Sequence, residues 1–293
     1  MPVDYIPPVD KTATQHDGTE SLAINNTIFR RVCTLLALNT TGRFYPYNGG
    51  CKPISKHVIV KSGYWAHLTE AATMKYIAEH TSIPVPKIYC SFVYNKRAYM
   101  VMERIQGDTV AAIWFQLSEE SRSRILEDLK RIILELRRIK PAPGTGVQSC
   151  VGGSLRDCRM PRSCPRFGPF KTIKEFHLWL REYLLPSEIL DKPDNTRSSD
   201  VSMMVAHQDR EYPHPIFTHG DLHPQNILVR DDKIVGIIDW EFSGWYPNYW
   251  EYTSAWMGNR IREGWQEVLP RFLETFPEEL EMERIRHQWW GEY

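Results

Sequence analysis

The sequence predicts an α+β fold in two lobes, a small β-rich amino-terminal lobe followed by a larger, mainly helical one. Three observations indicate this arrangement. Short apolar runs separated by turn residues gather in residues 43–103, and helical apolar spacing dominates after residue 118. A strand–turn–strand pattern at 227–238 interrupts the helices. Strands gathered in one part of a chain and helices in another are typical of the α+β class.

Composition sets the broad class of protein. The chain has 293 residues, 42% of them hydrophobic, which is enough for a substantial core. Lys plus Arg and Asp plus Glu both number 36, so the zero net charge gives no overall attraction to nucleic acid or to an anionic membrane. No apolar run approaches the roughly 18–20 residues of a membrane span, and the first residues do not resemble a secretion signal. We expect a cytoplasmic protein that binds neither nucleic acid nor membrane.

The first part of the chain combines a polar tail with one helical and two strand patterns. Residues 1–18 are polar and Pro-rich, which predicts a flexible tail. A helix is predicted over 21–38, and strands are predicted at 43–47 and 57–61. The loop between these strands contains Gly49 and Gly50. Asn-Gly-Gly is typical of a hairpin turn, but the amides of such a loop can also cradle phosphate, and both interpretations stay open.

The next segment contains a candidate ion pair. Lys61 ends an apolar strand, and Thr69 is predicted to cap a helix with Glu70 in its first turn. A glutamate at that position can face the sheet and hold the lysine; the alternative is a solvated lysine at the end of a strand. Strands are then predicted at 88–94 and 97–103 around a two-residue turn. The second of these leads into residues 104–107.

Helical patterns dominate the rest of the chain. Ser118 is predicted to cap a helix that ends near Ile139, and Thr172 with Glu175 forms a capping-box pattern before another helix. Residues 186–210 look like a variable connection. An amphipathic stripe over 265–276 is followed by several glutamates, which we interpret as the solvent face of a helix, although they would also suit a cationic substrate.

The segment 141–169 is rich in Pro, Gly, Cys and Arg and is predicted to be irregular. Its arginines either attract an acidic substrate or lie in a solvated loop, and we favour the solvated loop; they are Arg156, Arg159, Arg162 and Arg166. The six cysteines of the chain are scattered and are expected to be reduced thiols. The spacing of Cys150, Cys158 and Cys164 is too wide for the short cysteine pairs of usual zinc sites.

The most informative stretch is 217–240, FTHGDLHPQNILVRDDKIVGIIDW. Asp221 and Asn226 share a polar loop, and Asp239 follows the apolar hairpin. Carboxylate and amide oxygens suit magnesium, and transfer of a terminal phosphoryl group needs mainly positioning and charge neutralisation. This pattern predicts Asn226 and Asp239 as metal ligands, and Asp221 as the group that orients an acceptor hydroxyl and takes its proton. The alternative is a hairpin with ordinary turn acids.

The run 219–227, HGDLHPQNI, together with Ile238, Asp239 and Trp240, resembles the signature of the aminoglycoside phosphotransferase and choline kinase-like family. The resemblance extends over about 27–252, and 244–252, GWYPNYWEY, is similar to fungal members. It implies a protein kinase-like fold and an ATP- and Mg²⁺-dependent transfer of the terminal phosphate to a hydroxyl of a small molecule. It also implies that 19–105 form the nucleotide-binding lobe and that 106–293 form the lobe with the catalytic loop, the metal site and the acceptor pocket.

The resemblance further assigns nucleotide contacts. It makes Lys61 and Glu70 the ion pair beside the nucleotide phosphates, and it folds the loop with Gly49 and Gly50 over those phosphates. It also implies that main-chain groups at a hinge hydrogen-bond the adenine and that two methionines flank it. These residues are Met100, Met102, Glu103, Arg104 and Ile105. The other interpretation of this segment is a sheet edge that leads into a linker.

Two histidines flank the proposed base, and the resemblance gives both a structural role. His219 is expected to pack beneath the loop and bond the backbone, and His223 to shape the turn that presents Asn226. Two alternatives to a small-molecule kinase stay open: a catalytically silent nucleotide-binding or scaffold protein of the same fold, and a protein kinase, whose pattern has Arg at position 220. The acceptor, the choice of ATP or GTP, and the oligomeric state are left open by the sequence.

Overall fold

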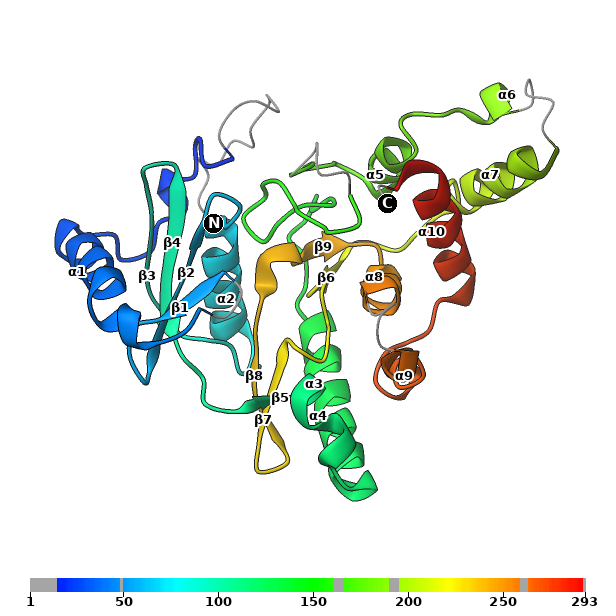
Figure 1. The fold of residues 1–293 in the computed structure, drawn as a ribbon. Coiled ribbons are helices and arrows are strands. Elements are labelled where there is room, and N and C mark those ends of the chain that lie inside the picture. The colour runs from blue at the N-terminus through cyan, green and yellow to red at the C-terminus, as the bar shows by residue number, and fades with distance from the viewer. Residues whose placement is uncertain (1–14, 48–49, 161–165, 190–194, 259–262, 292–293) are drawn as a thin grey trace.

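The computed structural model of the chain describes residues 15–47, 50–160, 166–189, 195–258 and 263–291 (Figure 1). A four-stranded antiparallel sheet flanked by helices forms one side of the molecule, and a mainly helical part with two smaller sheets forms the other. This arrangement agrees with the predicted α+β class. Most of the predicted tail, residues 1–18, lies outside the described residues.

The four-stranded sheet has the order β1-β2-β4-β3. Its strands are β1 (Cys51–Pro53), β2 (Val58–Gly63), β3 (Ile88–Tyr94) and β4 (Arg97–Glu103). The hairpin of β3 and β4 confirms the prediction, with Asn95 and Lys96 at positive φ in its turn. The strand predicted at 43–47 is wrong, because Thr41–Phe44 form the 3-10 helix η2. The outer strand is β1, which pairs with β2.

A different helix packs on each face of this sheet. Directly paired residues of antiparallel strands point to the same side, so Val60 and Val101 share one face. That face packs against α1 (Ile28–Asn39) through leucines of the helix. Lys61 and its partner Met100 point to the opposite face, where α2 (Leu68–His80) lies. The sheet therefore presents Lys61 towards the rest of the molecule.

Two predicted helix starts need correction. α1 begins at Ile28, because Thr27 accepts a hydrogen bond from the amide of Arg30 and caps the helix there. Only the short 3-10 helix η1 (Glu20–Leu22) lies within the earlier part of the predicted range. α2 is capped by His67 and not by Thr69, since His67 Nδ1 accepts the amide of Thr69.

The helical part surrounds a second hairpin. Strand β7 (Ile227–Arg230) pairs with β8 (Lys233–Ile237) through a turn at positive φ, as predicted, and β5 (Asp108–Thr109) adds to β7. Strands β6 (Ile216–Thr218) and β9 (Gly244–Tyr246) form a separate pair. The long helix α4 (Glu119–Arg137) starts at its predicted cap, Ser118. The remaining elements are α3 (Val110–Ile113), η3 (Trp114–Gln116), α5 (Ile173–Leu180), α6 (Pro186–Ile189), α7 (Asn195–Gln208), η4 (Trp240–Phe242), α8 (Trp250–Gly258), α9 (Glu263–Gln266), η5 (Leu269–Arg271) and α10 (Pro277–Trp290).

Several C-terminal expectations were wrong. The supposed connection 186–210 contains the helices α6 and α7. The stripe at 265–276 is divided between α9 and η5, and the glutamates that follow it belong to α10. Glu283 of α10 is fully buried, so it does not belong to a solvent face. Among the described residues, no helix has both the length and the apolar character needed to cross a membrane.

Candidate functional site

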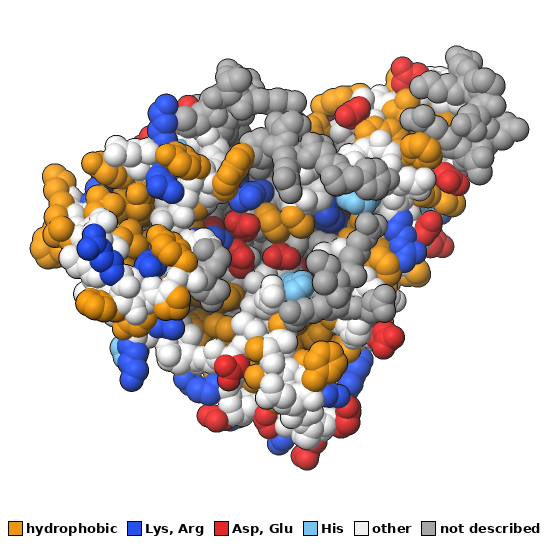
Figure 2. All heavy atoms as spheres, viewed as in Figure 1, with side chains coloured by type: hydrophobic (Ala, Val, Ile, Leu, Met, Phe, Trp, Pro, Cys, Tyr) orange, Lys and Arg blue, Asp and Glu red, His pale blue; other side chains and the backbone are white. Residues whose placement is uncertain are grey.

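Lys61 of β2 lies among three carboxylates. Its Nζ is 2.9 Å from Glu70 Oε2, 2.6 Å from Asp239 Oδ1 and 3.4 Å from Glu241 Oε2. Glu70 comes from the first turn of α2, whereas Asp239 and Glu241 follow β8. Figure 2 shows acidic side chains gathered in the hollow between the two lobes. The structure thus brings together the predicted pair Lys61–Glu70 and one predicted metal ligand, Asp239.

The charges in this group influence one another. Burial lowers the pKa of Lys61, but the three carboxylates outweigh burial and hold it well above its usual value. Glu70 is 2% exposed; burial raises its pKa, with help from Asp239 and Glu241 and against the opposing effect of Lys61. Oxygens of the three acids lie within 4.8 Å of one another. Lys61 and Arg156, which lies 3.2 Å from Glu241, are two cations for three acids, so the set keeps hard oxygen ligands that suit a divalent cation.

The hairpin places Asn226 beside Asp239. Ile227 pairs with Ile237 across the hairpin, and the amide of Ile238 donates to Asn226 O at 3.0 Å. Asp239 has left-handed backbone angles, φ 65° and ψ 60°, and its side chain is 37% exposed. Left-handed geometry is tolerated by Asp and Asn better than by most residues. The turn therefore directs a partly solvated carboxylate from the end of the hairpin towards Lys61.

Asp221 and Asn226 are joined directly. Asn226 Nδ2 donates to Asp221 Oδ2 at 2.8 Å and to Asp221 O at 2.9 Å, and the Asn226 amide donates to His223 O at 2.8 Å. This arrangement leaves Asn226 Oδ1 as the oxygen that can meet a cation. Burial, together with the charge of Asp239, raises the pKa of Asp221 to about 7, while the hydrogen bond from Asn226 opposes the rise.

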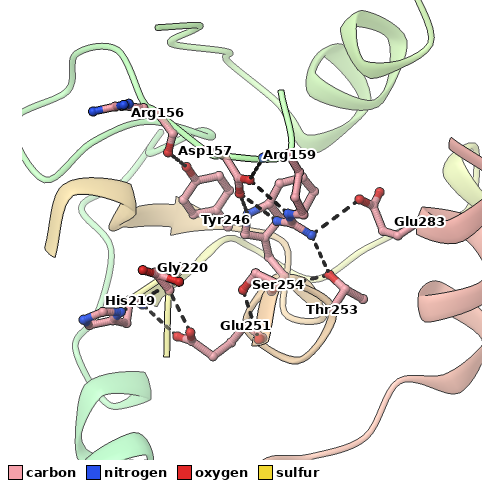
Figure 3. A network of polar contacts seen from close by, with 12 residues as sticks. Arg156, Asp157, Arg159, His219, Gly220, Tyr246, Glu251, Thr253, Ser254 and Glu283 are labelled. Carbon is pink, nitrogen blue, oxygen red and sulfur yellow. Dashed lines mark hydrogen bonds and ion pairs between the residues drawn. The ribbon is translucent and has the colours of Figure 1, made fainter. Parts of the chain in front are cut away.

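The loop before Asp221 is anchored from below by Glu251 of α8 (Figure 3). Glu251 Oε2 accepts the amide of His219 at 2.7 Å, and Oε1 accepts the amide of Gly220 at 3.1 Å. His219 Nδ1 accepts the amide of Asp221, so Nε2 carries the proton and donates to Ile238 O at 3.1 Å. Burial lowers the pKa of His219 to about 4, which keeps this tautomer neutral. His219 thus has the structural role that was expected.

Gly220 is required by the backbone. Its φ is 83°, a left-handed value that favours glycine. A Cβ at this position would lie 2.6 Å from the carbonyl oxygen of Phe242. The loop that presents Asp221 and the segment that follows Asp239 therefore touch through backbone atoms, and no side chain fits between them.

The prediction of a solvated arginine loop is wrong for Arg159. Its side chain is 5% exposed and pairs with Asp157 Oδ2 at 2.7 Å and with Glu283 Oε2 at 3.6 Å (Figure 3). The guanidinium also lies over the ring of Trp250 at 4.2 Å from the centroid. These contacts tie the irregular segment to α8 and α10. Arg162 lies outside the described residues.

Arg156 lies beside the acidic group. Its Nη1 is 3.2 Å from Glu241 Oε2 and 3.0 Å from the carbonyl oxygen of Trp65. Sequence reasoning missed Glu241 and gave Arg156 no place in the site. The position of Glu241, two residues after Asp239, is a signal that could have indicated it. Arg156 reaches the site through tertiary contacts alone. Of the three clustered cysteines, Cys150 is buried, Cys158 is exposed, and Cys164 lies outside the described residues.

The residues expected to contact the nucleotide lie in the loop before β2 and at the end of β4. Gly49 lies outside the described residues, and Gly50 O accepts the amide of Ser62 at 3.2 Å. Met102 is buried in the main core cluster. At the hinge, the Glu103 amide donates to Lys87 O and the Arg104 amide donates to His57 O. Within the described ranges, the amide of Ile105 has no such partner, which leaves it open to a ligand.

A comparison with family models identifies the chain. Residues 67–286 match the model of the phosphotransferase enzyme family. The chain belongs to this family. No curated protein matches the chain. The match covers Glu70, Asp221, Asn226, Asp239 and Glu241, so most of the candidate site lies within the family region.

Solved structures of similar fold agree with this assignment. Aminoglycoside phosphotransferase APH(4)-Ia is 13% identical, with 89% of this chain and 90% of that chain covered and a TM-score of 0.55. The streptomycin–ATP–APH(2")-IIa ternary complex is 14% identical, covers 91% and 89%, and has a TM-score of 0.55. ADP-bound APH(2'')-Ib is 15% identical, covers 89% and 86%, and has a TM-score of 0.52. These likenesses confirm the protein kinase-like fold; the fungal subdivision stays a prediction.

Proposed function

We propose that this chain is an ATP- and Mg²⁺-dependent phosphotransferase that moves the terminal phosphate to a hydroxyl of a small molecule. The main support for this proposal is the ion pair of Lys61 with Asp239, together with the hydrogen bond between Asp221 and Asn226. Membership of the phosphotransferase enzyme family supports the reaction type. Complexes of structurally similar proteins with ATP and streptomycin, or with AMP-PNP and hygromycin B, support a nucleotide and a hydroxylated acceptor.

Lys61 would hold the nucleotide phosphates. Glu70 is buried and contacts its Nζ, so the lysine is fixed in one position on the sheet. When phosphates enter, their oxygens would share the ammonium with Glu70 and replace part of its contact with Asp239. The loop with Gly49 and Gly50 would cover the phosphates. Main-chain groups of residues 103–105, among them the amide of Ile105, would hydrogen-bond the adenine, and Met100 and Met102 would flank it.

The residues fit a magnesium ion. Asn226 Oδ1 and the partly exposed carboxylate of Asp239 are hard oxygen ligands placed side by side by the hairpin, and Glu241 adds a third acid nearby. When bound, Mg²⁺ would supply neutralisation of the charge on the transferred phosphoryl group. Asn226 and Asp239 are the proposed ligands, and Lys61 stays beside them as the cation that meets the phosphates directly.

Asp221 would orient the acceptor hydroxyl and accept its proton. Asn226 Nδ2 donates to Oδ2 of the carboxylate and to the backbone oxygen of Asp221, so Oδ2 is held and Oδ1 is left for the acceptor. A pKa of about 7 is close to the operating pH of a cytoplasmic enzyme, which is the range in which a general base is most effective. Under this proposal 19–105 form the nucleotide lobe and 106–293 the acceptor lobe.

A screen of hydroxylated metabolites for ADP release from Mg-ATP tests the proposal. We expect at least one aminosugar, choline-like compound or other hydroxylated metabolite to stimulate release, and Asp221→Asn to abolish that stimulation. A parallel thermal-shift measurement with Mg-ATP reports binding. Binding without turnover for any acceptor, and without slow hydrolysis that depends on Asp221, would identify a silent nucleotide-binding protein instead.

A further inference from the structure

The side of the amino-terminal lobe formed by α1 and η2 keeps large apolar side chains in solvent. Ile28, Phe29, Val32 and Leu36 of α1 are 82%, 77%, 49% and 59% exposed, and Phe44 of η2 is 87% exposed. Residues four apart lie on one side of a helix, so three of them form a row. Leu35 and Leu38, which pack on the sheet, are less exposed than these residues. We call these five exposed residues the α1 face.

The chain segment that contains the α1 face is basic. Residues 21–69 contain six basic residues and no Asp or Glu, although the chain as a whole is neutral. Apart from Lys61, none of the six forms an ion pair within the described ranges. Figure 2 shows hydrophobic and basic side chains together over α1. The six are Arg30, Arg31, Arg43, Lys52, Lys56 and Lys61.

The basic residues near α1 are held in place by neutral groups. Arg30 Nη1 donates to Tyr89 O at 2.9 Å, and Arg31 Nε donates to Asn26 Oδ1 at 2.6 Å. Their positive charges are therefore positioned but not neutralised. Fixed cations beside protruding apolar side chains attract a surface that is negatively charged and can also admit apolar groups.

We propose that the α1 face docks on the surface of an anionic lipid bilayer. Apolar side chains on a helix enter the boundary between headgroups and acyl chains, and basic residues beside them attract anionic headgroups. A second copy of the chain is a poorer occupant, because two such faces would bring Arg30, Arg31 and Arg43 of both copies together without a carboxylate between them. The zero net charge of the chain conceals this local attraction.

Docking through the α1 face leaves the candidate site accessible. α1 covers the face of the sheet that carries Val60, whereas Lys61 points to the opposite face. Solutes could therefore reach the hollow between the lobes while α1 rests on a membrane. The inference stands on exposure and charge, so it holds whether or not the proposed phosphotransferase activity is found.

Sedimentation of the full chain with vesicles tests the docking. We expect binding to vesicles of phosphatidylcholine mixed with phosphatidylserine, little binding to phosphatidylcholine alone, and a loss of binding at high salt. Phe44→Gln should weaken the binding by about tenfold, because it removes one apolar side chain from the contact. Arg43→Gln should weaken it by about fivefold. Phe115→Gln is the matched control, because Phe115 has the same 87% exposure in the other lobe.

The outcomes separate the possible occupants. Equal losses from Phe44→Gln and Phe115→Gln, or no binding to phosphatidylserine vesicles, would overturn the proposal. Concentration-dependent dimers that Phe44→Gln abolishes, without vesicle binding, would assign the face to a second copy. Binding of poly-glutamate in place of vesicles would assign it to an acidic polypeptide. Unchanged melting temperatures of the variants verify that each one is folded.

Discussion

Lys61 Nζ lies 2.6 Å from Asp239 Oδ1, and this contact joins the four-stranded sheet to the end of a hairpin 178 residues later in the chain. The contact matters because Lys61 also faces Glu70 and Glu241. Lys61 is therefore the one cation that contacts all three acids, and its removal leaves Glu70 and Asp239 without a positive partner while Arg156 stays beside Glu241.

Lys61→Met is expected to lower ADP release by about a hundredfold or more, because it removes a cation aimed at the transferring phosphate. It should also cost about 3–5 kcal/mol of unfolding free energy, as is usual when one partner of a buried ion pair is lost. The loss should shrink at acidic pH, because the remaining carboxylates then take up protons. Denaturant unfolding at two pH values measures this. Lys75→Met, which removes an exposed pair on α2, is the control.

Asp221→Asn is expected to reduce turnover by about 10²–10⁴-fold with little change in the affinity for Mg-ATP. In the native protein, kcat/KM should rise with pH and level off above about 7, because Asp221 must lose its proton to act as base. Steady-state kinetics across pH checks both expectations. A pH profile that stays level through this range would contradict the role of Asp221.

The same substitution should change stability in the opposite direction. The pKa of Asp221 is raised from 3.8 to about 7 by burial, so the unfolded chain loses this proton before the folded chain does. Between these values ionisation favours the unfolded state, and the cost is fully present above about pH 7. Asp221→Asn should therefore melt at a higher temperature than the native protein at pH 8, with the difference vanishing near pH 4. Asp128→Asn, at an ion pair on α4, is the control variant for these melting temperatures.

Asp239→Asn is expected to remove the magnesium dependence of nucleotide binding, with a loss of affinity of about 10–100-fold. Asparagine is preferred to alanine because position 239 has φ 65°, which Asn tolerates. Titration of ATP with and without Mg²⁺ measures the change. Asp232→Asn is the matched control, since Asp232 also has positive φ, at the turn of the same hairpin. Equal effects of the two variants would point to the hairpin backbone and not to the carboxylate.

Arg159→Met is expected to destabilise the protein by about 3–5 kcal/mol, because it leaves Asp157 buried without its cation and removes one of the two cations beside Glu283. Arg284→Met is a close control. Arg284 also lies 4.2 Å from a tryptophan ring centroid and pairs with a glutamate, but it is exposed, so its loss should cost less than about 1 kcal/mol. Urea unfolding of both variants compares the two costs. Similar values would mean that the buried network contributes no more than a surface pair.

The elements predicted well from the sequence are those with local signals. The β3–β4 hairpin has two apolar strands around a turn, and α4 has both a serine cap and a regular apolar stripe. The hairpin before Asp239 follows the same rule. In these segments the side-chain period and the turn chemistry point to one structure, so distant contacts need not be known. The pairing of Lys61 with Glu70 was also predictable, because a first-turn glutamate faces the neighbouring strand.

The rest of the site depends on contacts between distant segments. β1 is only three residues long and exists through its pairing with β2, so the sequence places no strand there. Arg159 is buried, and it forms an ion pair there with Glu283 of α10, which lies far along the chain. In α10, the buried ion pair of Glu283 and Arg286 places two charged residues on the buried side, so the sequence shows no regular apolar spacing there. Single-sequence patterns treat such charges as solvent-exposed, because nothing local reveals their partners.

The close approach of Gly220 to Phe242 O also limits which side chains this chain can accept at position 220. An arginine at position 220, as in the protein kinase pattern, does not fit this main-chain path, because its Cβ would lie 2.6 Å from the carbonyl oxygen of Phe242. Position 220 and the stretch after Asp239 would have to be rebuilt together. A substitution at position 220 alone is therefore expected to displace the main chain beside both Asp221 and Asp239.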